Sequence, residues 1–143
     1  MIQKFVIQGN PRGQGRPRAC KRGKHAGIYE AKEDTVYKQN LAAQVVAQRP
    51  HFIGAGIPVE IEAHFYLTRP QAHFGTKGLK PRYEDARPLG KPDVDNMIKA
   101  IKDAVKGIVW HDDSQVVRVI GEKHYADTAP HITIEVKSPT VAA

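Results

Sequence analysis

The segment at residues 90–107, GKPDVDNMIKAIKDAVKG, predicts an amphipathic helix over about 95–106. Its apolar side chains recur with the helical period and form one stripe, made of Met97, Ile98, Ile101, Ala104, Val105 and Ile108. Gly107 is placed to cap the C-terminus of this helix. A helix with one apolar stripe buries that stripe against a neighbouring layer, so we expect it to pack on a β-sheet.

Two aspartates lead into this helix. Asp93 and Asp95 follow Pro92, whose ring favours extended backbone at this point. Side chains two apart in an extended segment point the same way, so we expect both carboxylates on one side and Val94 in the core. Such a pair is a site for a hard divalent cation, which prefers oxygen ligands. The alternative is that both acids only cap the helix and complement its dipole.

A second acidic pair, Asp112 and Asp113, follows the helix in WHDDSQVV (110–117). A tight turn after the helix can send the next strand back along it, so we expect the second pair to approach the first. Lys99 lies one turn after Asp95 on the same face, and Asp103 lies one turn further. These three residues form either a surface ladder of ion pairs or a functional group. In the functional group, Lys99 meets a phosphate or orients a carboxylate, and Asp103 holds Lys99.

The remaining segments predict an α/β (α+β) fold. Strands are expected at 2–9, 58–67, 114–125 and 131–137, and a second helix at about 31–48. This order, β-α-β-α-β-β, predicts a mixed β-sheet with helices packed on it, in a single domain spanning 1–143. The turn DTAP (127–130) predicts that the last two strands form a hairpin. His64 alternates onto the polar side of its strand, which is typical of an ordinary solvent-facing residue.

The chain is basic, with 22 Lys and Arg against 15 Asp and Glu and a formal net charge of +7. This balance favours a polyanionic partner, although many proteins are basic only for solubility. Residues 11–27, PRGQGRPRACKRGKHAG, contain six cations and no acid: Arg12, Arg16, Arg18, Lys21, Arg22 and Lys24. Glycine and proline interrupt this segment, so we expect a flexible cationic loop that follows DNA phosphates.

A second long loop is expected at residues 68–92, which show no periodicity and many Gly, Pro and charged side chains. It carries six further cations: Arg69, Lys77, Lys80, Arg82, Arg87 and Lys91. Loops of this length in compact domains are usually functional or disordered. The segment is therefore either a further contact with a polyanion, including one from Lys91, or an idle insertion.

Other kinds of site are not indicated by the sequence. Cys20 is the single cysteine, and the seven histidines are scattered without a zinc motif, so we expect no structural zinc and a reducing, cytoplasmic compartment. No signal peptide, membrane span, G-x-S-x-G or Walker A motif is found. Carboxylates and a lysine in a basic protein favour phosphodiester cleavage, with Mg²⁺ (or Mn²⁺ in its place) held by the acids.

The run KPDVDNMIKAIKDAVKGIVWHDDSQVV, at 91–117, resembles the signature of the RusA-like Holliday-junction resolvases. These are small, Mg²⁺-dependent, homodimeric endodeoxyribonucleases of bacteria and phages. The resemblance implies that the metal is bound by Asp93, Asp95 and Asp113, with Lys99 as the basic residue of the site. It also implies supporting roles for Asp112 and Asp103, and packing of Trp110 under the site.

The function expected from these observations is resolution of four-way DNA junctions by paired phosphodiester cleavage in recombination and repair. A homodimer suits this substrate, because a junction has two-fold symmetry and needs two cuts. The expected location is the cytoplasm of a bacterial cell or phage-infected host. Two alternatives stay open: a non-catalytic nucleic-acid-binding protein, and a metal nuclease acting on other branched DNA or on RNA.

Overall fold

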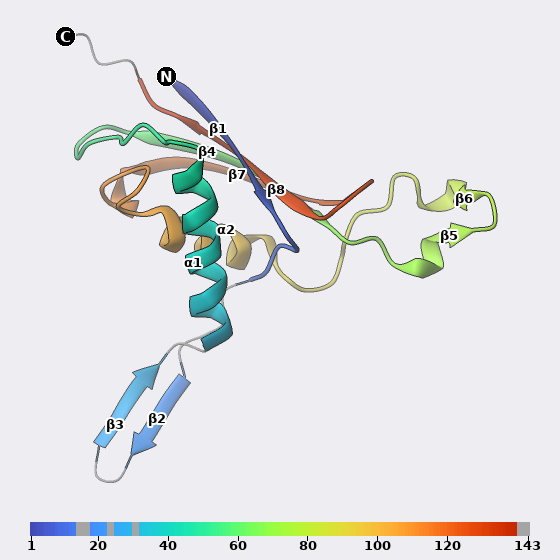
Figure 1. Cartoon of the computed structure of the whole chain (residues 1–143), viewed down its shortest axis with the longest axis horizontal. Coiled ribbons are helices and arrows are strands. Elements are labelled where there is room, and N and C mark those ends of the chain that lie inside the picture. Colours follow the sequence, from blue (N-terminus) through green and yellow to red (C-terminus); the bar gives the residue numbers. More distant parts are fainter. Residues whose placement is uncertain (14–17, 23–24, 30–31, 140–143) are drawn as a thin grey trace.

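The computed structural model describes residues 1–13, 18–22, 25–29 and 32–139. The expected mixed α+β architecture is confirmed: two helices pack on a four-stranded sheet (Figure 1). In chain order these elements are β1 (Ile2–Gln8), α1 (Lys32–Ala47), β4 (Val59–Leu67), α2 (Val94–Val105), β7 (Val116–Tyr125) and β8 (His131–Lys137). The order predicted for the main elements, β-α-β-α-β-β, is therefore correct.

The strands of the sheet lie in the order β1-β8-β4-β7. β7 pairs in parallel with β4, and the other two pairings are antiparallel. The prediction that the last two strands form a hairpin was wrong, because β4 lies between β7 and β8 in the sheet. Residues 126–130 cross the end of β4, where the Ala126 N–H donates to the Leu67 carbonyl at 2.7 Å. The crossing spans two strand spacings, roughly 10 Å, which five residues cover easily.

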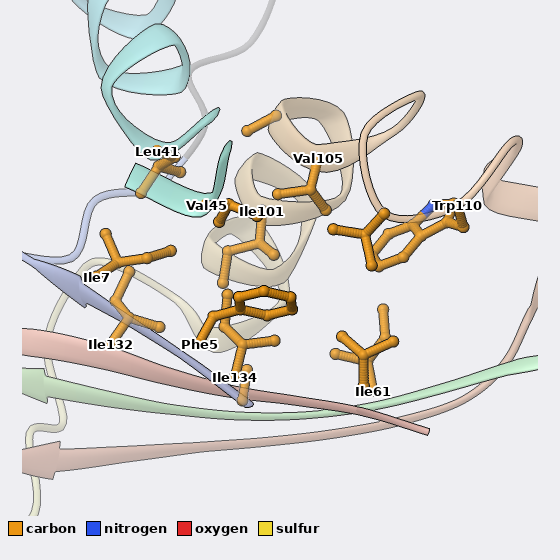
Figure 2. Packing of buried hydrophobic residues seen from close by; sticks show 14 of the residues in the cluster. Phe5, Ile7, Leu41, Val45, Ile61, Ile101, Val105, Trp110, Ile132 and Ile134 are labelled. Atoms are coloured by element: carbon orange, nitrogen blue, oxygen red, sulfur yellow. The ribbon is translucent and has the colours of Figure 1, made fainter. Parts of the chain in front are cut away.

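Both helices cover the same face of the sheet (Figure 1). The core between the two layers is built from alternate strand residues and the apolar sides of α1 and α2 (Figure 2). Trp110, which is completely buried, closes one end of this core beside Val105 (Figure 2). The opposite face of the sheet carries polar and half-buried side chains, such as His64 on β4. Within the part of the chain that the structure describes, neither helix is long and apolar enough to cross a membrane.

The segment expected as a cationic loop at 11–27 is instead largely a hairpin. β2 (Arg18–Arg22) pairs antiparallel with β3 (His25–Tyr29). The hairpin extends from the N-terminal end of α1, away from the sheet (Figure 1). Two strands provide backbone partners to one another that an isolated loop lacks, and this offsets the weak strand preference of Gly27 in β3.

The segment at 68–92 is a folded insertion between β4 and α2. It contains two 3₁₀ turns and a short hairpin: η1 (Gln71–His73), β5 (Phe74–Gly75), β6 (Gly78–Leu79) and η2 (Pro81–Tyr83). Arg69, which was expected to be a surface cation, is buried. Its Nη1 donates to the Tyr83 carbonyl at 2.8 Å, and its guanidinium lies over the Tyr125 ring. Arg69 therefore anchors the insertion to the end of β7.

Candidate active site

Asp93 occupies the N-cap position of α2, with extended backbone angles (φ −75°, ψ 147°). The helix begins at Val94, one to two residues earlier than expected. Asp93, Val94 and Asp95 therefore do not form one extended segment, and that prediction was wrong. The reason is that the N-cap is the last residue with extended backbone, so Asp95 lies within the first helical turn.

The carboxylate of Asp93 makes no capping hydrogen bond. Among the residues that the structure describes, Asp95 likewise has no side-chain hydrogen bond or ion pair, and both residues are exposed. A capping role predicts that the Asp93 carboxylate accepts from a backbone N–H of the first turn. The hydrogen-bonding part of this alternative is therefore not seen, although Asp93 at the N-cap and Asp95 in the first turn both lie where an acid complements the helix dipole. Neither carboxylate is committed to a hydrogen bond that would keep it from a ligand.

The second acidic pair lies at the other end of α2. The helix has 12 residues, which is a length of roughly 18 Å. Gly107, with φ of 81°, ends it as predicted, and Asp113 begins the 3₁₀ turn η3 (Asp113–Gln115) just beyond. β7 does run back along α2, since a Cβ at Gly121 would lie 3.0 Å from Val94 Cγ2. Because both acids precede β7, they stay at its far end.

Within one chain the two acidic pairs therefore do not meet, and that expectation was wrong. In the described part of the chain, no aspartate belongs to a group of three or more His, Cys, Asp or Glu side chains whose ligand atoms lie within 4.8 Å of one another.

Trp110 orients the carboxylate of Asp113. Its indole Nε1–H donates to Asp113 Oδ1 with 3.0 Å between the atoms. The buried ring cannot turn away, so this oxygen is held in one direction. The sequence predicted only packing for Trp110. This hydrogen bond could have been predicted, because a buried Trp usually finds an acceptor for its indole N–H and an aspartate lies three residues after Trp110.

Asp112 supports the turn that carries Asp113. Its Oδ2 accepts from the Ser114 backbone N–H at 3.1 Å and from the Ser114 hydroxyl at 2.5 Å. Its Oδ1 lies 3.1 Å from Lys106 Nζ. The hydrogen bond from the Ser114 hydroxyl, followed by that from Lys106, holds the pKa of Asp112 well below its usual range. A supporting role was predicted for Asp112, but its two partners, Lys106 and Ser114, were not predicted.

Lys99 and Asp103 do not form the expected pair. Asp103 Oδ2 lies 3.7 Å from Lys38 Nζ on α1, so it joins the two helices. Among the described residues Lys99 makes no ion pair, and its side chain is exposed. By helical spacing it remains on the same face as Asp95. Lys99 therefore stays a candidate for binding a phosphate, while a holding role for Asp103 is not seen.

The basic segment starts beside the first acidic pair. A Cβ at Gly13 would lie 3.1 Å from Asn96 Cβ and 3.2 Å from Pro92 Cβ, so the chain runs closely past the start of α2. Arg12 is not a free loop cation, because its Nη2 lies 3.1 Å from the buried Asp34. Lys91 is exposed.

The structure describes only some of the other residues that were predicted to contact DNA. Arg18, Lys21 and Arg22 lie on β2, of which the structure describes the backbone. Arg16 and Lys24 lie outside the described residues.

The sequence model of one family, described as Endodeoxyribonuclease RusA, matches residues 8–137. The chain belongs to this RusA endodeoxyribonuclease family. The matched region contains both helices, the main sheet from the end of β1 onward, and both acidic pairs. Membership in the RusA family makes the protein an endodeoxyribonuclease.

A protein from Bacillus subtilis (strain 168) is similar to this RusA-family chain along almost its whole length. This protein, "Uncharacterized protein YqaN", is 33% identical over 136 residues, which are 94% of each of the two chains. The similarity therefore extends far beyond the acidic motif.

Proposed function

We propose that this RusA-family protein is a Mg²⁺-dependent endonuclease that resolves four-way DNA junctions by paired cleavage as a homodimer. The observation that carries the proposal is the pair of exposed carboxylates at the start of α2, Asp93 and Asp95, which have no partner among the described residues. In a chain of net charge +7, such acids would repel DNA unless a cation occupied them.

The residues present fit a hard divalent ion. Asp93 and Asp95 offer only oxygen atoms, which Mg²⁺ prefers, and neither carboxylate is committed to capping. When bound, such an ion lowers the pKa of a water and neutralises charge on the phosphate being cleaved. Lys99, on the same helical face, would bind the negative phosphate beside these acids. The cationic segment that passes Pro92 and Asn96 would keep the DNA backbone close to them.

Asp113 completes the site in this proposal, but from a second copy of the chain. In one chain it is separated from Asp93 by the length of α2, roughly 18 Å. A two-fold axis that sets two α2 helices antiparallel would place the end of one beside the start of the other. Each of two equivalent sites would then use Asp93 and Asp95 of one copy and Asp113 of its partner.

Cleavage and binding of a synthetic four-way junction test the proposed function. We expect Asp93→Asn, Asp95→Asn and Asp113→Asn each to abolish cleavage in Mg²⁺ while gel-shift affinity in chelator is unchanged or tighter. Asp127→Asn, which removes an exposed acid in the turn before β8, is the matched control and should cut normally. A variant among the first three that still cuts at the wild-type rate removes that aspartate from the site.

The substrate test uses the same protein with other nucleic acids. Cleavage of the four-way junction in preference to a flap, a three-way junction and structured RNA supports the proposal. Equal or better cleavage of those substrates would favour a broader branched-DNA or RNA nuclease. Junction binding with no cleavage under any divalent cation would favour a non-catalytic binding protein.

A further inference from the structure

We infer that the open face of the sheet carries a binding site for a divalent transition ion of the zinc class. Its ligands are His64 of β4 and Glu122 and His124 of β7. Within the described part of the chain, this is the one group of His, Cys, Asp or Glu whose three ligand atoms all lie within 4.8 Å of one another. The inference does not depend on the proposed nuclease function, because none of these residues belongs to the acidic pairs.

Strand pairing brings the three side chains together. In the parallel ladder His64 is paired with Glu122, and Tyr66 is paired with His124. Residues two apart on a strand share a face, so all three ligands project on the same side. Gly121, one residue earlier, faces α2 on the other side. The proposed ion therefore lies on the face of the sheet opposite the helices.

The distances match one face of a tetrahedral coordination sphere. His64 Nδ1 lies 2.9 Å from His124 Nε2, and Glu122 Oε2 lies 3.5 Å from the first atom and 3.4 Å from the second. A tetrahedral zinc ion with bonds of about 2.0–2.2 Å keeps its ligand atoms roughly 3.3–3.5 Å apart. Only the two imidazoles need to separate, by a few tenths of an ångström. The three side chains are 25%, 42% and 24% exposed, which leaves the fourth position to water or an added ligand.

A second carboxylate fixes the tautomer that such a site needs. Glu62 Oε2 lies 3.1 Å from His64 Nε2, and an ionised carboxylate only accepts hydrogen bonds. In neutral His64 the proton therefore sits on Nε2, and the lone pair of Nδ1 faces His124. This carboxylate–histidine pairing is the usual second layer around a metal-bound imidazole. An ion would replace the proton between the rings, with His124 then carrying its proton on Nδ1.

The donor set selects the kind of ion. Two imidazole nitrogens and one carboxylate suit zinc and neighbouring transition ions, whereas Mg²⁺ requires oxygen ligands. The ion would join β4 to the edge strand β7. It would also compete with Arg87 of the insertion, whose Nη1 lies 3.8 Å from Glu122 Oε2. The chain would then hold two metal sites of different chemistry on opposite faces of one sheet.

Zinc titration without DNA or Mg²⁺ tests the inference. We would use tag-free protein in a Cys20→Ser background, which removes the single thiol, and compete for Zn²⁺ with a chromophoric chelator. We expect one Zn²⁺ to bind per chain and this binding to be lost in His124→Ala. In a second titration, excess Mg²⁺ should not compete with Zn²⁺. Glu62→Gln should weaken binding about tenfold or more. His131→Ala is the matched control: its ring stacks on Tyr66 on the same face, outside the proposed ligand set.

Two comparisons decide the outcome. Retention of zinc by Asp93→Asn, together with its loss in His124→Ala, supports a site separate from the acidic pairs. Equal zinc affinity in His124→Ala and the unsubstituted protein, or no saturable binding at all, would overturn the inference. X-ray absorption on the zinc-loaded chain needs no ligand substitution and guards against misfolded variants. Two imidazoles in the zinc shell are expected, and a shell without imidazole would refute the site.

Discussion

The indole Nε1–H of Trp110 and Oδ1 of Asp113 are joined by a hydrogen bond of 3.0 Å, so a completely buried ring positions a half-buried carboxylate. The helix α2 and the core thus determine where both ends of the acidic motif lie. The structure separates these ends within one chain. It also gives each end its own means of being held in place, and these can be tested one by one.

The hydrogen bond from Trp110 can be removed while an aromatic ring is kept. Trp110→Phe frees the Asp113 carboxylate to rotate, and a hydrogen bond to a charged group is worth about 1.5–3 kcal/mol. We expect kcat for junction cleavage to fall about tenfold, the equivalent of about 1.4 kcal/mol, with DNA affinity unchanged. Single-turnover cleavage and gel shift separate the two effects. An unchanged kcat in a folded variant would mean that the bond serves packing alone.

Gly121 permits close approach of β7 to the first turn of α2. A Cβ there would lie 3.0 Å from Val94 Cγ2 and 3.2 Å from Ile98 Cδ1, so Gly121→Ala requires these side chains, and the first turn of α2 that carries them, to shift by a few tenths of an ångström. We expect a loss of about 1–3 kcal/mol in the free energy of unfolding and slower cleavage, because Asp93 moves with the helix. Gly54→Ala, where a Cβ meets nothing within 4 Å, is the control for denaturant unfolding and cleavage. Equal behaviour of the two variants would contradict this account.

Asp112 predicts a specific dependence of stability on pH. Its pKa is lowered in the folded chain, so its stabilising effect is complete above its unfolded-state pKa of about 3.9 and is lost as pH falls through the lower folded-state value. Ser114→Ala should raise the pKa of Asp112 toward the ordinary value, as read from its carboxyl carbon by NMR. The stability difference from wild type should be constant at neutral pH and vanish in strong acid. Ser138→Ala should leave this titration unaltered.

The β2–β3 hairpin predicts a change in salt dependence. Replacing Arg18, Lys21 and Arg22 of β2, together with Arg16 from the preceding part of the sequence, by Gln should weaken binding to junction and duplex alike. The slope of log affinity against log salt should flatten by about 0.9 for each DNA phosphate that the variant no longer neutralises. Lys4→Gln and Arg49→Gln, elsewhere on the chain, provide the comparison per charge removed. An unchanged slope for the hairpin variant would show that the hairpin does not touch DNA.

Mixing two inactive variants tests whether sites are shared between copies. If Asp113 acts on the partner's site, a dimer of one Asp93→Asn chain and one Asp113→Asn chain retains one intact site. We expect this mixture to nick a cruciform plasmid, although each variant alone is inactive. Asp93→Asn mixed with Asp95→Asn should stay inactive, because both changes affect the same end of α2. If the first mixture does not nick the plasmid although mixed dimers have formed, each site must use aspartates from a single chain.

Local periodicity was enough to predict α2 and β4. In α2 every third or fourth residue is apolar and buried, and in β4 every second residue is, so both patterns can be seen in the sequence. Ile101 and Ile61, for example, were assigned to buried sides correctly. The order of the strands in the sheet could not be predicted from the sequence. DTAP marks a turn between the last two strands, but it does not say whether those strands pair with each other. The position of Asp113 depended on the length of α2 and on where β7 begins.

His64 shows a second limit of the sequence. Alternation placed it correctly on the polar side of β4, but His124 lies sixty positions away and reaches it only through the parallel ladder. The role of Arg69 was missed for a related reason. A cation in an aperiodic segment looks like a surface charge until its carbonyl partner, on Tyr83, is in place.

The alternation of Gly121 and Glu122 along β7 has a consequence for how this chain can vary. Deleting or inserting one residue in β7 would turn Glu122 toward Val94 and send the strand's small residue outward, which would bury a charge against the helix. Length changes should therefore be tolerated in the insertion at 68–92, outside the Arg69 anchor, and rejected in β7. Homologous chains should differ in length there, while the spacing from Asp113 to His124 stays constant.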